Sequence, residues 1–181
     1  MGREVTPPPE SRFFGGGAIV VGMASAPFLT WYLIPEGWYT LFFLLPLALY
    51  LAYTLYGLLL LIAAWFRWHG FPVRGLLILS DSPNWKTYIE ERWLPRLRDG
   101  VVILNWSERK TWPRSLPSRL FYHFCCIWNE NRNFNPAVIL FRGLRYPYVY
   151  RYYYAFRDAK RGRPEALHEL EAHMFREFSK G

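Results

Sequence analysis

The chain has 181 residues and a mass of 21.6 kDa, a size that suits one domain. Its charges are unevenly distributed: residues 13–66 contain one charged residue, Glu36, whereas residues 67–181 contain 20 Lys/Arg and 11 Asp/Glu. With 52% hydrophobic residues and two cysteines, this division excludes a simple soluble globule, a disordered chain and a disulfide scaffold. The sequence predicts a membrane-embedded part followed by a water-soluble part.

Two apolar segments, residues 13–34 and 38–66, each contain about the 20 residues that a helix needs to cross a bilayer. The link between them, Pro35-Glu36-Gly37, is long enough only for a tight turn, so we expect a transmembrane helical hairpin over residues 13–69. A secretory signal peptide is the alternative interpretation of the first segment, but its length favours a spanning helix. Residues 1–12 are expected to be a polar leader.

The distribution of basic residues around the two segments predicts their orientation. Arg3 and Arg12 precede the first segment, Arg67 and Arg74 follow the second, and the turn between the segments contains no Lys or Arg. Because positive residues near a helix end resist translocation, both termini are expected in the cytosol. We therefore predict a two-span protein of an inner or plasma membrane, with the lipid bilayer as its first partner.

Both predicted spans carry a face suited to helix packing. Small residues recur every four positions in the first span, at Ala18, Gly22 and Ala26. The second span offers a matching face that includes Tyr50, Tyr53 and Gly57. The two faces either pack on each other within one hairpin, or one of them binds a protein partner or a second copy of the chain.

Residues 70–181 alternate short apolar runs with polar clusters, a pattern typical of a small α/β domain. Strands are expected at residues 76–79, 101–104, 137–141 and 148–151. Helices are expected at residues 83–98, with Ser82 as N-cap and a break possible at Pro95, and at 116–129, 153–161 and from 164 onward. The first two strands and their helix predict a parallel unit, and the last two strands predict an antiparallel hairpin. The expected fold is a membrane-anchored α/β protein: a two-helix hairpin followed by a small cytosolic α/β domain with a partly parallel sheet.

Polar residues cluster where the first two predicted strands end, and ligands collect at the carboxyl ends of parallel strands. Asp81 and Glu108 are the candidate catalytic residues, one as a base or metal ligand and the other as its partner. The candidate ligand-binding residues around them are Ser80, Ser82, Asn84, Asn105, Ser107 and Arg109. Helix caps and Asx turns use the same residue types, so a purely structural role is the alternative interpretation.

The remaining motifs give no support for a metal or a cofactor. His123, Cys125 and Cys126 are close in sequence, but zinc needs at least three protein ligands in a suitable arrangement, and no second Cys/His pair follows. Neither a Walker loop nor a glycine-rich dinucleotide motif is present in the sequence. We therefore expect no metal site and no cofactor.

The charge of the water-soluble part indicates its partners. Its 20 basic and 11 acidic residues give a net charge of +9, with arginines interleaved among tyrosines from Phe141 to Arg163. A membrane-tethered chain meets anionic lipid first, so nucleic acid is disfavoured. The leading hypothesis is a membrane-anchored, non-catalytic subunit or adaptor that docks a protein partner or the anionic membrane surface. The alternative is a small membrane-attached enzyme or ligand-sensing domain that binds a phosphorylated or acidic small molecule at the strand ends.

Overall fold

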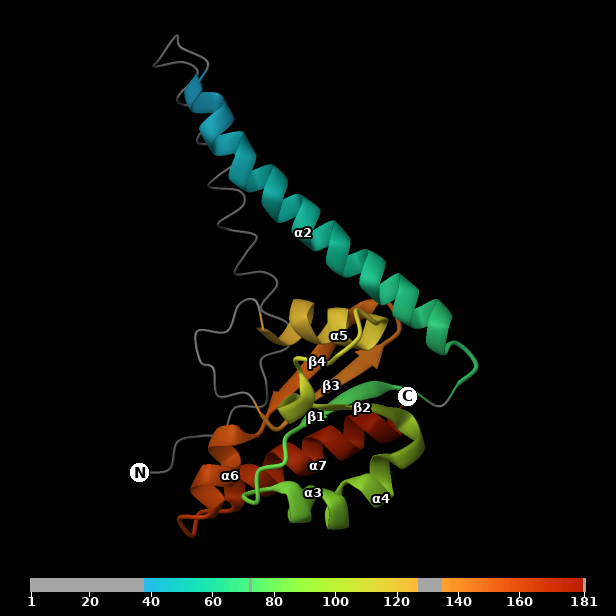
Figure 1. The fold of residues 1–181 in the computed structure, drawn as a ribbon, viewed down its shortest axis with the longest axis vertical. Helices are drawn as coiled ribbons and strands as arrows, with labels where there is room; N and C mark the ends of the chain where they lie inside the picture. The colour runs from blue at the N-terminus through green and yellow to red at the C-terminus, as the bar shows by residue number, and fades with distance from the viewer. Residues whose placement is uncertain (1–37, 72, 127–134, 181) are drawn as a thin grey trace. The chain divides into compact units, whose positions relative to one another are not determined.

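The structure is a computed structural model of the chain and describes residues 38–71, 73–126 and 135–180. These residues form one long helix followed by an α/β domain (Figure 1). The chain divides into two compact units, and one boundary falls inside the long helix, between Leu59 and Leu60. The unit that contains the α/β domain therefore also contains the last turns of that helix.

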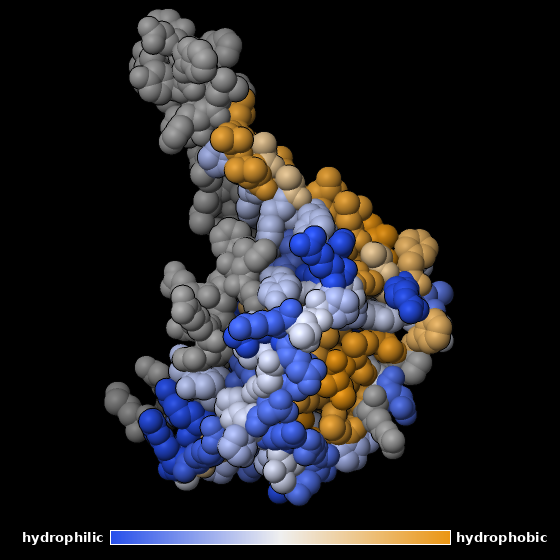
Figure 2. Space-filling view, viewed as in Figure 1, coloured by the Kyte–Doolittle hydropathy of each residue, from blue (hydrophilic) through white to orange (hydrophobic). Residues whose placement is uncertain are grey.

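Helix α2, Trp38–Trp68, is a continuous helix of 31 residues. From Leu44 to Trp68 its mean hydropathy is 2.1, so it is long and apolar enough to cross a membrane. Leucines that are more than half exposed occur along it, at Leu45, Leu49, Leu51, Leu55 and Leu59. Figure 2 shows the result as an apolar surface along the helix. Apolar surface of this extent is costly in water, at about 25 cal/mol per Å², and is stable in lipid.

The predicted two-helix hairpin is not confirmed, because the described residues contain one helix with these properties. The predicted second span, 38–66, corresponds to α2. The first span, 13–34, lies outside the described residues, together with its packing residues Ala18, Gly22 and Ala26.

The packing face predicted for the second span is less exposed than the rest of α2. Tyr50 and Tyr53 are half-buried and Gly57 is buried. Helical spacing of three to four residues places them on the same side of α2 as a buried group further along, Leu60, Leu61 and Ala64.

A mixed four-stranded sheet with strand order β2-β1-β3-β4 forms the centre of the α/β domain. Strands β1 (Gly75–Leu79) and β2 (Val101–Asn105) are parallel, as predicted. Strand β3 (Ala137–Arg142) runs antiparallel to β1, and β4 (Arg145–Arg151) runs antiparallel to β3 in a hairpin. All five residues of β1 are buried, which explains its uninterrupted apolar sequence.

Helices cover both faces of this sheet. Helices α3 (Lys86–Arg92) and α4 (Leu94–Leu97), followed by a 3-10 turn at Arg98–Gly100, connect β1 to β2. The remaining helices are α5 (Leu116–Phe121), which continues as a π-helical turn at Tyr122–Cys126, α6 (Tyr153–Ala159) and α7 (Glu165–Lys180).

Two apolar clusters hold the layers together. On one face, Leu77, Val138 and Tyr150 of the sheet pack with Trp93, which lies between α3 and α4, and with residues of α3, α4, α6 and α7 such as Met174. On the other face, sheet residues pack with α5 and with the end of α2, in a cluster that includes Leu76, Ile78, Ile139, Phe121, Leu60, Leu61 and Ala64. The last turns of α2 are therefore part of the domain core.

One predicted helix begins later than expected. The helix expected over 83–98 begins at Lys86, after a turn at residues 83–85. Ser82 precedes that turn: its Oγ accepts a hydrogen bond from the Asn84 N–H at 3.4 Å, and its carbonyl oxygen accepts one from the Lys86 N–H at 3.1 Å. The break expected at Pro95 is present: the helix is interrupted after Arg92 and resumes as α4, since proline lacks the N–H that a helix interior needs. The stretch expected to be helical over 116–129 is α-helical to Phe121 and π-helical from Tyr122 to Cys126, and residues 127–129 lie outside the described residues.

Candidate functional site

The polar loops that follow β1 and β2 lie at the same edge of the sheet. The two strands are adjacent and parallel, and Leu79 at the end of β1 pairs with Asn105 at the end of β2. A 3-10 turn, Trp106–Glu108, begins directly after β2, and the Asn105 side chain caps it by accepting a hydrogen bond from the Ser107 N–H at 3.0 Å. Residues 80–84 and 105–109 are thereby brought together.

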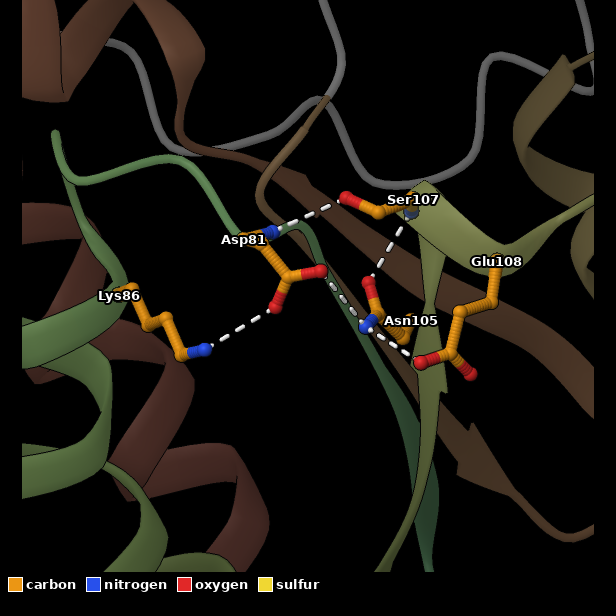
Figure 3. A network of polar contacts seen from close by, with 5 residues as sticks. All are labelled: Asp81, Lys86, Asn105, Ser107 and Glu108. Atoms are coloured by element: carbon orange, nitrogen blue, oxygen red, sulfur yellow. Dashed lines mark hydrogen bonds and ion pairs between the residues drawn. The ribbon is translucent and has the colours of Figure 1, made fainter.

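Asn105 is at the centre of a polar network that links the two loops (Figure 3). Its Nδ2 donates to Asp81 Oδ2 at 3.1 Å and lies 3.3 Å from Glu108 Oε1. The Asp81 N–H donates to Ser107 Oγ at 3.1 Å, and Lys86 Nζ donates to Asp81 Oδ1 at 3.0 Å. The two candidate carboxylates are thus joined by one amide group.

The other predicted site residues are arranged less closely. The Asn84 side-chain oxygen accepts a hydrogen bond from Lys160, and Ser82 contributes its hydroxyl to the local turn. Arg109 packs its guanidinium over the Trp106 ring, 4.8 Å from the ring centroid. Ser80 is half-buried. The structure therefore brings together Asp81, Asn105, Ser107 and Glu108 and adds Lys86, which the sequence did not indicate.

The network determines the titration of Asp81. The hydrogen bond from Asn105, followed by that from Lys86, stabilises the carboxylate and lowers the pKa of Asp81 below its ordinary value. Because the folded-state pKa is lowered, this contribution to stability is present above the unfolded pKa and is lost as pH falls through the folded value. The network should weaken in acid, and its contribution is moderate because the Asp81 side chain is 50% exposed.

This explanation predicts the direction in which variants shift the titration. Replacing Asn105 by Leu should raise the pKa of Asp81, because it removes the hydrogen bond that lowers this pKa most. Replacing Lys86 by Met should also raise it, because it removes both a hydrogen bond and the attraction of the ammonium charge. Carboxyl chemical shifts of Asp81, followed by NMR between pH 2 and 6, would measure both values. An unchanged pKa in either variant would contradict the assignment.

The chemistry available to this network is limited. Its hydrogen-bond donors and acceptors bind one another, and its charges are partly neutralised by Lys86. Asp81 and Glu108 are the two carboxylates that a cation would meet, but the described residues contain no group of three or more His, Cys, Asp or Glu suited to a metal ion. The geometry favours a structural role, in which the network links the loops that follow β1 and β2. The alternative is a ligand site, in which a ligand displaces the Asn105 amide from the two carboxylates.

A second region was missed by the sequence analysis. A cavity of about 530 Å³ lies where the end of α2, the β3–β4 turn and the end of α7 meet, and its lining includes Arg74, Arg142, Arg145 and Lys180. These residues come from four separate segments, so neither spacing nor a motif connects them. The one local signal was Arg142-Gly143-Leu144-Arg145, in which two arginines flank a hairpin turn.

Comparison with known proteins adds no family to these observations. No protein-family model matches the sequence, and neither a curated protein nor a solved structure matches the chain. The class is therefore defined by the structure alone: an α/β domain with a mixed four-stranded sheet, built onto a helix that is long and apolar enough to cross a membrane.

Proposed function

We propose that the protein is a membrane-anchored, non-catalytic adaptor or subunit whose α/β domain is held at the cytosolic surface of a membrane and docks a protein partner there. The observation that supports this best is that α2 has two roles: its first part has the apolar surface of a membrane helix, and its last turns belong to the domain core. Residues before Leu60 form an apolar helix, whereas Leu60, Leu61 and Ala64 are 5%, 5% and 2% exposed within the core of the α/β domain.

The length of α2 agrees with this division. A helix of 31 residues is about 46 Å long at about 1.5 Å per residue, well beyond the roughly 30 Å of hydrocarbon in a bilayer. Residues 38–59 alone would extend about 33 Å, which is enough to cross. The remaining turns, Leu60–Trp68, are then free to serve the domain. An anchor that continues into the domain core keeps the domain close to the membrane surface, as a membrane-anchored adaptor requires.

The outer edge of β2 is the surface that best suits a protein partner. Among the described strands, β2 pairs only with β1, so the backbone groups on its other side have no strand partner. Ile103, in the middle of β2, is 46% exposed. Figure 2 shows an apolar area on the α/β domain where β1 and β2 lie in Figure 1. An extended segment of a partner could pair with this edge and cover the apolar side chains.

Topology is the first test of this proposal. A membrane-impermeant thiol reagent, applied to intact vesicles that carry Glu36→Cys or a cysteine appended after Gly181, should label the two positions from opposite sides. The unmodified chain measures background labelling of Cys125 and Cys126. A C-terminus that is accessible only from the outer side would contradict the cytosolic placement, because it would reverse the charge rule.

The docking edge is tested by the mass of the gently extracted protein. We expect an assembly heavier than one 21.6 kDa chain, and Ile103→Lys should dissociate it because a charge on an edge strand opposes pairing. Tyr154→Lys is the matched control, since Tyr154 is similarly exposed, at 40%, and belongs to α6 and not to an edge strand. A wild-type protein that contains only one chain would contradict the adaptor proposal.

The second candidate function, a ligand-sensing or enzymatic domain, is favoured by one observation: Asp81 and Glu108 both contact the Asn105 amide. Under that function, the double variant Asp81→Asn/Glu108→Gln should abolish the response to a phosphorylated or acidic small molecule. Under the adaptor function, the same variant should leave the mass of the assembly unchanged.

A further inference from the structure

The cavity at the end of α2 has the size and the lining of a ligand site. Its volume of about 530 Å³ lies within the range of about 300–1,000 Å³ that is usual for small-molecule sites. Its lining includes Trp65 and Trp68 from the last turns of α2 and residues of the β3–β4 turn. All of its lining residues belong to the unit that contains the α/β domain.

The cavity is strongly basic. Four cationic side chains line it, whereas Glu177 is the one carboxylate among the described lining residues, which gives a net charge of +3 (four minus one). Glu177 is already paired with Lys180, whose Nζ lies 2.5 Å from Glu177 Oε1. Three arginines, Arg74, Arg142 and Arg145, therefore remain without an ion pair among the described residues.

Two of these arginines are cross-strand neighbours at the hairpin turn. Arg142 at the end of β3 pairs with Arg145 at the start of β4, and Gly143, with φ +61°, allows the tight turn between them. Like charges at opposite positions of an antiparallel pair are destabilising, and a bound anion would reduce this repulsion.

The guanidinium of Arg142 also retains bonding capacity. It lies over the Tyr148 ring, 3.7 Å from the centroid, and Nη1 donates to the Tyr148 hydroxyl at 2.9 Å. Its Nε is buried, so the N–H groups that a ligand could reach are those at the end of the guanidinium, on Nη1 and Nη2. Guanidinium N–H groups match the oxygens of a phosphate.

We propose that this cavity binds the phosphate headgroup of one anionic phospholipid, with Arg142 and Arg145 as its principal contacts. The inference rests on the proposed membrane anchoring and adds a specific lipid ligand to it. Arg74, whose Nη1 donates to the Phe178 carbonyl at 3.0 Å, is held at the same cavity and contributes further positive charge.

The surroundings of the cavity favour a lipid over a soluble phosphate compound. Trp65 and Phe66, at the end of α2, are 41% and 69% exposed, and Phe71 in the following loop is 62% exposed. Exposed aromatic residues next to basic residues at the end of a membrane helix are typical of headgroup depth. A cavity at this depth meets phospholipid phosphates directly.

Lipid retention by the full chain is the measurement that tests this proposal. The protein is purified in a neutral detergent, incubated with an equimolar mixture of short-chain phosphatidylglycerol and phosphatidylcholine, and analysed by native mass spectrometry. We expect one phosphatidylglycerol per chain. Equal retention of both lipids, or retention of neither, would overturn the proposal.

Variants locate the bound lipid. Each cation near an anionic lipid contributes about fivefold in affinity, so Arg142→Gln/Arg145→Gln should weaken retention about 25-fold. Arg161→Gln/Arg163→Gln removes the same charge from two exposed arginines and should retain the lipid. Arg145→Gln alone should weaken retention about fivefold. Because Arg145 is exposed, misfolding would not explain this loss of lipid. Glu177→Gln, which removes the acidic lining residue, should strengthen retention. Equal losses in the two double variants would overturn the assignment to this cavity.

Two further experiments distinguish a wrong lipid assignment from a wrong membrane-anchoring proposal. Glycerol phosphate and inorganic phosphate, offered alone, should bind far more weakly than phosphatidylglycerol; equal binding would mean a soluble ligand and would overturn the lipid assignment. Alkaline carbonate extraction of wild-type vesicles tests the anchor itself. Release of the chain would overturn the anchoring and the lipid site together, whereas a retained chain without bound lipid would overturn the site alone.

Discussion

Replacing Trp93 by Ala is expected to destabilise the α/β domain by about 3–5 kcal/mol, as large-to-small changes of fully buried aromatic residues do. Trp93 is 0% exposed and packs between the sheet and its helices, with its ring 4.5 Å from Tyr152 and 5.8 Å from Phe156, measured between ring centroids. Its Nε1 donates to Glu171 Oε1 at 2.5 Å. The change therefore removes packing and a charge-assisted hydrogen bond together.

Trp93→Phe removes the N–H donor and keeps an aromatic ring, so it loses the hydrogen bond and only part of the packing. We expect a loss of about 1.5–3 kcal/mol from the hydrogen bond to a charged group, with a smaller packing loss in addition because phenyl is smaller than indole. Tyr88 still donates to Glu171 Oε2 at 3.0 Å in that variant. Urea unfolding of the full chain in detergent micelles, followed by near-ultraviolet circular dichroism, measures both variants. Tyr154→Ala, at a site 40% exposed, is the control, and an equal loss there would contradict the central role of Trp93.

The strands were predictable because each buried strand corresponds to a short run of apolar residues. Residues 76–79 and 101–104 are uninterrupted apolar runs, and both were found as parallel strands within one residue of the predicted ends. The helix after the first strand was less predictable. Ser82 bonds the Asn84 N–H, as it would in either a turn or an N-cap, so its residue type does not specify that α3 begins only at Lys86.

The candidate site was predictable in position but not in detail. Parallel pairing brings the loops after β1 and β2 to one edge, as expected from strand order. The bridging role of Asn105 depends on side-chain orientation, which spacing along the chain does not specify. Lys86 was interpreted only as part of a helix, yet it neutralises Asp81.

The cavity at the end of α2 could not be predicted, because its arginines come together only through tertiary structure. Arg74 precedes β1, Arg142 and Arg145 flank the β3–β4 turn, and Lys180 ends α7. The contribution of α2 to the domain core was equally hidden. The sequence of α2 is apolar along its whole length and therefore predicts a membrane helix throughout. Only the packing of Leu60 and Leu61 shows where the helix becomes part of the domain core.

The second large effect is expected for Gly75→Ala, which should destabilise the domain by about 1–3 kcal/mol or more, the usual cost of overpacking. Gly75 is the first residue of β1, between β2 and β3. A Cβ at this position would lie 2.5 Å from the Ile139 carbonyl oxygen and 2.9 Å from Leu140 Cδ2. Because Ile139 O is a backbone atom of a neighbouring strand, the overlap can be relieved only by moving β1 away from β3.

Gly100→Ala is the matched control, since Gly100 is also buried and an added Cβ would also overlap a neighbour. There the obstacle is the ring of Phe178, a side chain near the end of α7 that can rotate away. A Gly to Ala change also stabilises by about 0.4–1 kcal/mol through the unfolded chain, so the net effect at Gly100 should be close to zero. Urea midpoints of both variants in micelles measure the difference. If Gly100→Ala were as destabilising as Gly75→Ala, backbone overlap would not be the reason that β1 begins with glycine.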